Sequence, residues 1–220
     1  MDGGGFVHLD ATYWGHNWGV MLGLDSHTWK PLYVGFIRNE TTSDYQDAVR
    51  SIEERGYRIN DLILDGKQSL FKVFSGYRIQ MCQFHMKQTV RRYITANPRL
   101  RCARELKELM NTLTWTRKED FCRGYRNWKT VWSDTLNRMT TLKSGKKTYT
   151  HKRLRSAMHS IDFYLPYLFT CQDEDCVGMP NTNNKIEGTS TDLKSNLNNH
   201  SGMSIENRKR FICGFFLALK

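Results

Sequence analysis

Five short apolar runs in the first 82 residues constrain the fold of this chain more than any other feature. Each run has the length of a strand and is bounded by turn-forming residues. The gaps between the first three runs are short, which favours antiparallel neighbours. Stretches with helical spacing of apolar residues lie on both sides of the fourth run, so we expect an α/β fold with a mixed sheet flanked by helices. The runs occupy residues 6–9, 18–24, 31–37, 59–64 and 77–82.

The pattern changes to nearly continuous helix over residues 84–169. Thr116 and Glu119 match a capping box that would open one of these helices, and its apolar stripe continues to Met139. Residues 144–147 are expected to form a basic loop, and two further helices are expected over 184–197 and 205–219, with a turn at 198–202 between them. We therefore divide the chain into a first core segment at 1–86, an all-helical basic insertion at 87–175 and C-terminal core helices at 176–220.

Positive charge is concentrated in this middle part of the chain. The 220 residues carry 33 lysines and arginines against 22 acids, a net charge of +11. Residues 87–158 alone contain 19 of the basic residues and only 5 acids, so the rest of the chain is slightly acidic. Such a block predicts binding to a polyanion, most often nucleic acid, although a solvated basic helical surface is the alternative.

No apolar run approaches the length of about 20 residues that a membrane helix needs. The N-terminus resembles no secretory signal, and the six cysteines are widely spaced. We therefore expect a soluble intracellular protein with free thiols and no membrane partner.

Two of the apolar runs end in an aspartate, Asp10 and Asp65. If their strands are neighbours, the two carboxylates repel each other, and divalent cations relieve that conflict. Carboxylate oxygens suit two Mg²⁺ or Mn²⁺ ions, which can assist cleavage of a phosphodiester. Glu187 is the best third acid, because it begins a helix after a polar loop. Asp192 or the acidic cluster at 173–175 is the alternative.

Cys82 and His85 have the spacing of a zinc half-site, but a structural zinc site needs about four ligands. Cys171 and Cys176 could complete it, yet a role in supporting the acidic site is favoured over zinc. Trp132 fits a helix core, with stacking on an unpaired base near the site as the alternative. The candidate DNA contacts are Lys146, Lys147, Lys152, Arg153, Asn184, Lys185 and Lys194.

Four motifs in this order resemble a known enzyme family. They are Leu9-Asp10-Ala11-Thr12, Ile63-Leu64-Asp65-Gly66, Cys82-Gln83-Phe84-His85 and Asn183-Asn184-Lys185-Ile186-Glu187-Gly188. Together they look like the catalytic core of a DDE transposase, similar to the Mutator-like transposases and their bacterial insertion-sequence relatives.

The resemblance implies an RNase H-like fold, with metal-binding acids on the first strand, the fourth strand and a late helix. It implies 3′-end cleavage and strand transfer on transposon ends and target DNA, by a homodimer or higher assembly. The compartment would be the cytoplasm or nucleoid of a bacterium, or the nucleus of a eukaryote. The alternatives are an RNase H-like nuclease without strand transfer and a truncated or domesticated DNA-binding module without catalysis.

Overall fold

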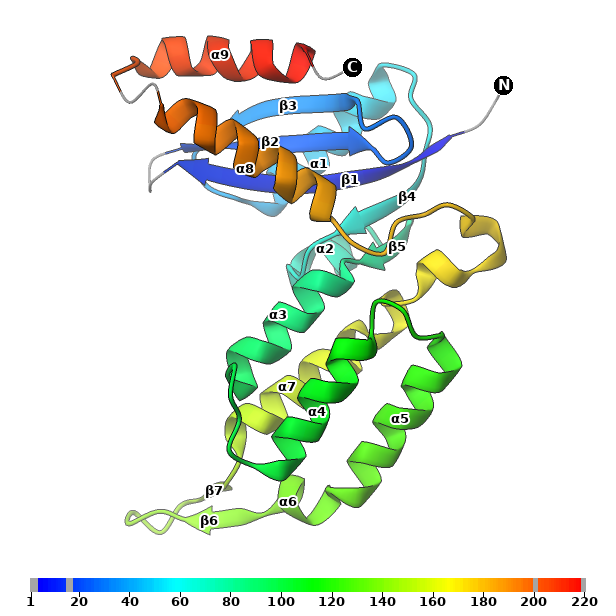
Figure 1. Cartoon of the computed structure of the whole chain (residues 1–220), viewed down its shortest axis with the longest axis vertical. Coiled ribbons are helices and arrows are strands. Elements are labelled where there is room, and N and C mark those ends of the chain that lie inside the picture. The colour runs from blue at the N-terminus through cyan, green and yellow to red at the C-terminus, as the bar shows by residue number, and fades with distance from the viewer. Residues whose placement is uncertain (1–3, 15–17, 200–201, 219–220) are drawn as a thin grey trace.

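A mixed sheet of five strands forms the upper part of the molecule (Figure 1). The computed structural model describes residues 4–14, 18–199 and 202–218. The strand order is β3-β2-β1-β4-β5; β1, β2 and β3 are antiparallel, and β4 and β5 run parallel to β1. The predicted α/β fold with a mixed sheet is confirmed. The strands are β1 (Gly5–Trp14), β2 (Trp18–Asp25), β3 (Pro31–Ile37), β4 (Ile59–Leu64) and β5 (Arg78–Met81).

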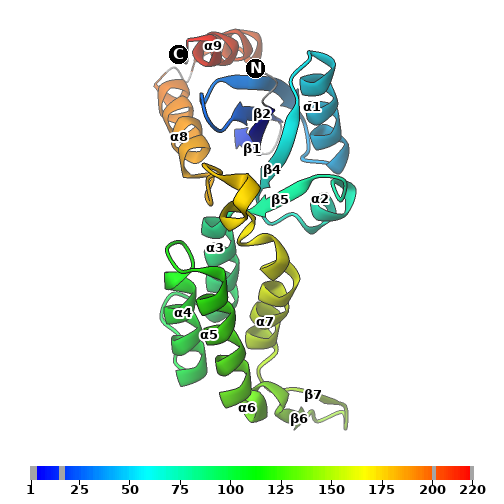
Figure 2. The ribbon, with the colours of Figure 1, turned by 90° about the vertical axis from the view of Figure 1, so that its right-hand side faces the viewer.

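Helices cover both faces of this sheet (Figure 2). Helix α1 (Thr42–Glu54) packs on one face, and helices α8 (Asn184–Asn198) and α9 (Ile205–Leu217) pack on the other. The short α2 (Gln68–Val73) follows β4. Thr41 caps α1, because its hydroxyl accepts from the backbone N–H of Asp44 while the Asp44 carboxylate accepts from that of Thr41.

The side chains of β1 alternate between the two faces, as the strand period of two requires. Val7 and Leu9 are fully buried in the core that includes α1. Burial of a side chain of this size stabilises the fold by about 1.5–3 kcal/mol. His8 lies between them in the sequence and reaches Asn183, which precedes α8. Asp10 shares the face of His8, so α1 covers one side of β1 while the polar side chains point toward α8.

A helical block extends away from the sheet (Figures 1 and 2). Its centre is aromatic: Tyr125 stacks on Trp128, and Phe121 packs against Phe169. The Trp128 indole N–H also donates to the carbonyl of Cys102 at 2.8 Å. The helices are α3 (Gln83–Ile94), α4 (Arg101–Thr112), α5 (Lys118–Val131), α6 (Ser133–Asn137) and α7 (Lys152–Tyr164).

The expectation that this block is all-helical is wrong, because it contains a two-stranded hairpin. Strands β6 (Met139–Thr141) and β7 (Lys147–Tyr149) pair antiparallel, and Met139 belongs to the hairpin rather than to the stripe of α5. Gly145 turns the chain with a φ of +78°, which glycine adopts without a steric penalty. Paired threonines on both strands favour extended backbone.

The predicted capping box at Thr116 is also absent. Helix α5 begins at Lys118, and neither Thr116 nor Arg117 caps it with a side chain. Instead, the distant Gln172 side chain accepts from the N–H of Lys118 at 2.9 Å and donates to the carbonyl of Thr116 at 3.0 Å. A tertiary contact therefore replaces the local cap.

The return from the helical block to α8 passes through three 3₁₀ turns, η1 (Leu165–Tyr167), η2 (Thr170–Gln172) and η3 (Glu174–Cys176). Helix α3 spans the domain boundary predicted after residue 86 and joins the sheet to the block. Within the described ranges, no helix is both long and apolar enough to cross a bilayer. All six cysteines are described, and none forms a disulfide.

Candidate active site

The register of β1 against β4 aligns Asp10 with Asp65. The parallel pairs Val7–Leu62 and His8–Ile63 both have an offset of 55 residues. Two positions further along each strand, the same offset joins Asp10 to Asp65. Asp65 directly follows β4, as predicted. Asp10 does not end its strand, because β1 continues to Trp14 and Asp10 is paired with Leu22 of β2. It lies where β4 stops accompanying β1.

The two aspartates share a poorly solvated, negatively charged environment. Burial, followed by the charge of Asp65, raises the pKa of Asp10 to about 8. The hydrogen bond that Asp10 accepts from the N–H of Ala11, at 2.9 Å, opposes this rise. Burial, followed by the charge of Glu40, raises the pKa of Asp65 to about 6. A cation bound to these carboxylates would favour their ionised forms and so oppose both shifts.

Glu187 comes to this site on the first turn of α8. Its charge also raises the pKa of Asp10, which places it within electrostatic reach of the strand carboxylates. Its backbone N–H donates to the carbonyl of Asn183 at 3.1 Å, so the start of α8 depends on the position of Asn183. The structure therefore places Asp65 and Glu187 within electrostatic reach of Asp10.

Asn183 is fully buried and is held from two sides. The Nδ1 atom of His8 lies 2.6 Å from its Oδ1 atom, and the ring donates this hydrogen bond. Its own backbone N–H donates to Sγ of Cys82 at 3.2 Å. Burial lowers the pKa of His8 to about 4 and raises the pKa of Cys82 to about 11, so both side chains are uncharged near neutral pH. They link β1 and β5 to α8.

His85 supports the third acid directly. Its Nε2 atom lies 3.4 Å from Oε1 of Glu187, and both side chains are partly buried. Burial lowers the pKa of His85, while the charge of Glu187 acts in the opposite direction. Cys82 caps the N-terminal side of α3, and its N–H donates to the carbonyl of Leu64, next to Asp65. The Cys82–His85 pair thus connects the second acid to the third.

A cavity of about 310 Å³ opens beside Asp65 and His85. Its wall contains three charged residues that sequence reasoning missed, Glu40, Lys67 and Arg92. Lys67 could have been found from its position two residues after Asp65, and Arg92 from its position two helical turns after His85. Glu40 precedes a helix cap and carries no local signal of a site. The two cations give this acidic cavity groups that can bind a phosphate.

The carboxylate oxygens of the three acids are the ligands that divalent cations such as Mg²⁺ prefer. Among the described residues, Oδ1 of Asp65 and Oε1 of Glu187 are buried without a hydrogen-bond partner, although Oε1 of Glu187 lies 3.4 Å from Nε2 of His85. In the described part of the chain, no three His, Cys, Asp or Glu side chains already converge as a metal-binding group. The charges of Asp65 and Glu187 nonetheless both act on Asp10.

The predicted DNA contacts fall into two separate regions. Lys146 and Lys147 lie on the exposed hairpin at the end of the helical block remote from the sheet (Figure 1). Lys152 begins α7 beside it, whereas Arg153 donates to the backbone carbonyl of Arg92 at the end of α3.

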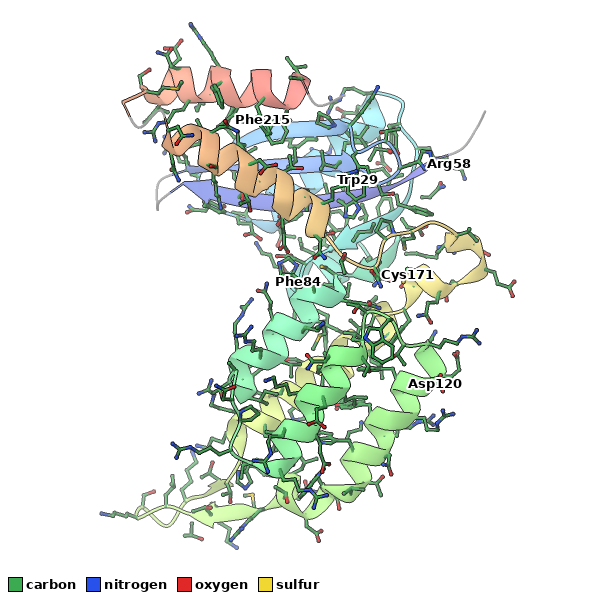
Figure 3. The ribbon with its side chains drawn as sticks, viewed as in Figure 1. Trp29, Arg58, Phe84, Asp120, Cys171 and Phe215 are labelled. Carbon is green, nitrogen blue, oxygen red and sulfur yellow. The ribbon has the colours of Figure 1, made fainter. Side chains whose placement is uncertain are left out.

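The other predicted contacts lie on α8. Asn184 and Lys185 are exposed on its first turn, and Lys194 is partly exposed further along the helix. The ammonium group of Lys185 lies 4.5 Å from the ring centroid of Trp29, beside the start of α8 (Figure 3). The ring of Trp29 in turn packs on His8, with centroids 4.9 Å apart.

Trp132 is not brought to the acidic site. It ends α5, and its indole N–H donates to Oε2 of Glu105 on α4 at 2.7 Å. The guanidinium of Arg101 covers its ring. Trp132 therefore joins two helices of the block, and its contacts support the structural role and not the alternative of stacking on a base.

Comparison with known proteins adds no relative: no family model matches the chain, and no curated protein matches its sequence.

Proposed function

We propose that this chain is the catalytic domain of a DDE transposase, which cleaves the 3′ ends of a transposon and joins them to target DNA. The observation that carries the proposal is the register that sets Asp10 beside Asp65, with Glu187 on the facing helix. The strand order, three antiparallel strands followed by two parallel ones, is compatible with the RNase H-like fold that the motifs imply. The helical block lies between the second and third acids, as in the resembled family.

Asp10, Asp65 and Glu187 would hold two Mg²⁺ or Mn²⁺ ions. When bound, such ions lower the pKa of the attacking water or hydroxyl group and stabilise the charge that develops on a phosphodiester. His85 orients Glu187, and Asn183 fixes the helix that carries it. Lys67 and Arg92 line the cavity next to Asp65 and are placed to bind a nonbridging phosphate oxygen. No protein nucleophile is required.

The helical block supplies the second requirement, a surface for DNA. Its excess of basic residues suits contacts with the phosphate backbone, which position a duplex without reading its sequence. The hairpin places Lys146 and Lys147 far from the acids, so a duplex that reached both regions would lie along the block.

A strand-transfer assay with supplied transposon-end duplexes and a target plasmid tests the proposal. We expect Mg²⁺-dependent end cleavage and joining, both of which fall at least 100-fold in Asp10→Asn. Asp134→Asn, a substitution of an exposed acid on α6, is the matched control and should retain activity. Cleavage without joining would favour the RNase H-like nuclease. DNA binding without metal-dependent cleavage would favour the non-catalytic module. Either result would overturn the transposase assignment.

A further inference from the structure

A second and larger cavity lies between α3 and α4. Its volume is about 660 Å³, roughly twice that of the acidic cavity. Phe84, at the start of α3, forms one end of its wall (Figure 3), and Lys107 of α4 lies on the opposite side. We call this cavity the α3–α4 groove. Neither the metal-binding role of the acids nor the exposed hairpin accounts for it.

The α3–α4 groove is strongly basic. Four cations line it, and no acidic side chain of the described residues does. Lys107 donates to the carbonyl of Ala96 at 2.6 Å. The side chains of Lys87, Arg91 and Arg92 form no ion pair with an acid in the described ranges. These uncompensated charges attract an anionic ligand.

The groove is connected to the candidate active site through α3. Arg92 lines both the groove and the acidic cavity. Its charge influences the pKa values of Asp65 and His85, which confirms its closeness to the acids. At the other end of the same helix, the rings of Phe84 and His85 lie 6.1 Å apart and edge to face. A ligand in the groove would therefore adjoin the reacting phosphate.

The wall is not only charged, and this distinguishes it from a simple phosphate-binding surface. Phe84 is partly exposed, and the buried side chains of Val90 and Met110 form an apolar floor. The amides of Gln88 and Asn111 border the same space and can pair with base edges. Cations beside an aromatic ring and amides are the combination that binds unpaired nucleotides.

We infer that the α3–α4 groove binds unpaired nucleotides of the DNA strand that continues from the cleavage site. Its volume is that of a pocket for a small molecule, which suits one or two nucleotides and excludes a duplex. Phosphates would meet Lys87 and Arg91, and a base would pack against Phe84. The inference rests on the proposed function for the identity of the strand, but the binding it predicts requires no metal and no cleavage.

Fluorescence anisotropy of the full chain with a labelled oligo(dT) strand, in the presence of EDTA, tests this inference. We expect Arg91→Glu combined with Lys87→Glu to weaken binding of the single strand at least tenfold. Arg50→Glu combined with Arg55→Glu reverses two exposed charges at α1, outside the groove and the helical block, and should change affinity less than threefold. A blunt duplex should lose much less affinity in the groove variant. Thermal melting confirms that each variant is folded.

A second measurement examines stacking. An oligonucleotide with 2-aminopurine should lose fluorescence on binding the native chain, and Phe84→Leu should reduce that loss at least twofold while keeping an apolar wall. Equal losses of single-strand and duplex affinity, or an unchanged 2-aminopurine signal in Phe84→Leu, would overturn the groove assignment. Failure of metal-dependent cleavage alone would instead overturn the proposed function, so the two failures are distinguishable.

Discussion

Two aspartates, Asp10 and Asp25, have opposite effects on the stability of the fold. Asp10 is costly to bury, because burial and the charge of Asp65 both oppose its ionisation. Asp25, at the end of β2, is buried but is well satisfied: it accepts from the N–H groups of His27 and Thr28 and from the hydroxyl of Tyr57. The charge of Asp10 is thus poorly compensated within the protein, whereas that of Asp25 is compensated by hydrogen bonds.

We predict that Asp10→Asn stabilises the metal-free protein. The amide removes the repulsion from Asp65 and keeps the shape of the side chain, so the free energy of unfolding should rise by roughly 1–3 kcal/mol. Denaturant unfolding in EDTA measures this change. Added Mg²⁺ should stabilise the native chain but not the variant. A less stable Asp10→Asn protein would contradict the electrostatic description of the site.

Asp25→Ala should have the opposite effect and a distinct pH dependence. Burial raises the pKa of Asp25, but the hydrogen bonds from Thr28, Tyr57 and His27 outweigh it and leave the pKa lowered. The unfolded chain therefore binds more protons in acid, so this contribution is present above about pH 4 and is lost as the pH falls through the folded-state pKa. Urea unfolding between pH 3 and 7 should show a loss of roughly 1–3 kcal/mol at neutral pH that narrows in acid. A pH-independent loss would disprove the role of the ionised carboxylate.

At the scale of elements, the site depends on how one helix is attached to the sheet. Helix α8 carries Glu187, and its start is fixed by Asn183 through His8 and Cys82. Its other anchor is apolar, since Ile186, Leu193 and Leu197 are buried against β2. The apolar contacts hold α8 on the sheet, whereas the polar contacts of Asn183 determine where its first turn lies.

We therefore predict that Asn183→Ala loosens the first turn of α8 and leaves the rest of the helix in place. Hydrogen exchange of the amides around Glu187 should become at least tenfold faster, while those around Leu193 and Leu197 change little. Asn199→Ala, at the exposed end of the same helix, is the matched control. Uniformly faster exchange along α8 would mean that Asn183 supports the whole helix and does not specifically position its start.

The elements differ in how far the sequence predicts them. The five strands follow from apolar runs whose length and spacing are local properties, and the alignment of Asp10 with Asp65 follows once β1 and β4 are neighbours. The hairpin was missed because each of its strands has three residues, too few to display a period. The start of α5 was missed because its cap comes from Gln172.

In the candidate site too, local features could be predicted from the sequence and tertiary contacts could not. Asp65 and Glu187 stand at recognisable element ends, and Asp10 follows a recognisable apolar run within β1. Lys67 and Arg92 lie at short spacings from Asp65 and His85, whereas Glu40 joins the site only through tertiary packing, which no single stretch of sequence encodes. The indole ring of Trp132 is suited to stacking on a base. Its contact with Glu105 joins two helices, and such a tertiary contact cannot be predicted from the local sequence.

At the scale of the whole molecule, the basic residues are separated from the candidate catalytic acids. The acids lie at the sheet, while the basic residues are concentrated in the block that extends from it (Figure 2). The α3–α4 groove begins where these two parts meet. This arrangement suits a substrate that is held along the block and cleaved at its upper end.

DNA affinity should consequently depend steeply on salt. With four phosphate contacts, affinity falls roughly 100-fold between 50 and 200 mM salt. Replacing Lys146 and Lys147 by alanine should reduce the slope of log affinity against log salt by about two if both contact phosphates. Titrations of a labelled duplex measure the slope, with Arg50→Ala as a control on α1. A shallow slope in the native chain would remove the block from the DNA interface.

The central claim is that Asp10, Asp65 and Glu187 form one metal-binding active site. Anomalous diffraction from crystals grown with Mn²⁺ tests it most directly, because the scattering locates the ion independently of any activity. We predict a Mn²⁺ peak in contact with the carboxylates of Asp10 and Asp65, with Glu187 completing the site, and no such peak in Asp10→Asn crystals. The absence of a peak at these carboxylates in the native chain, or an unchanged peak in Asp10→Asn, would contradict the claim.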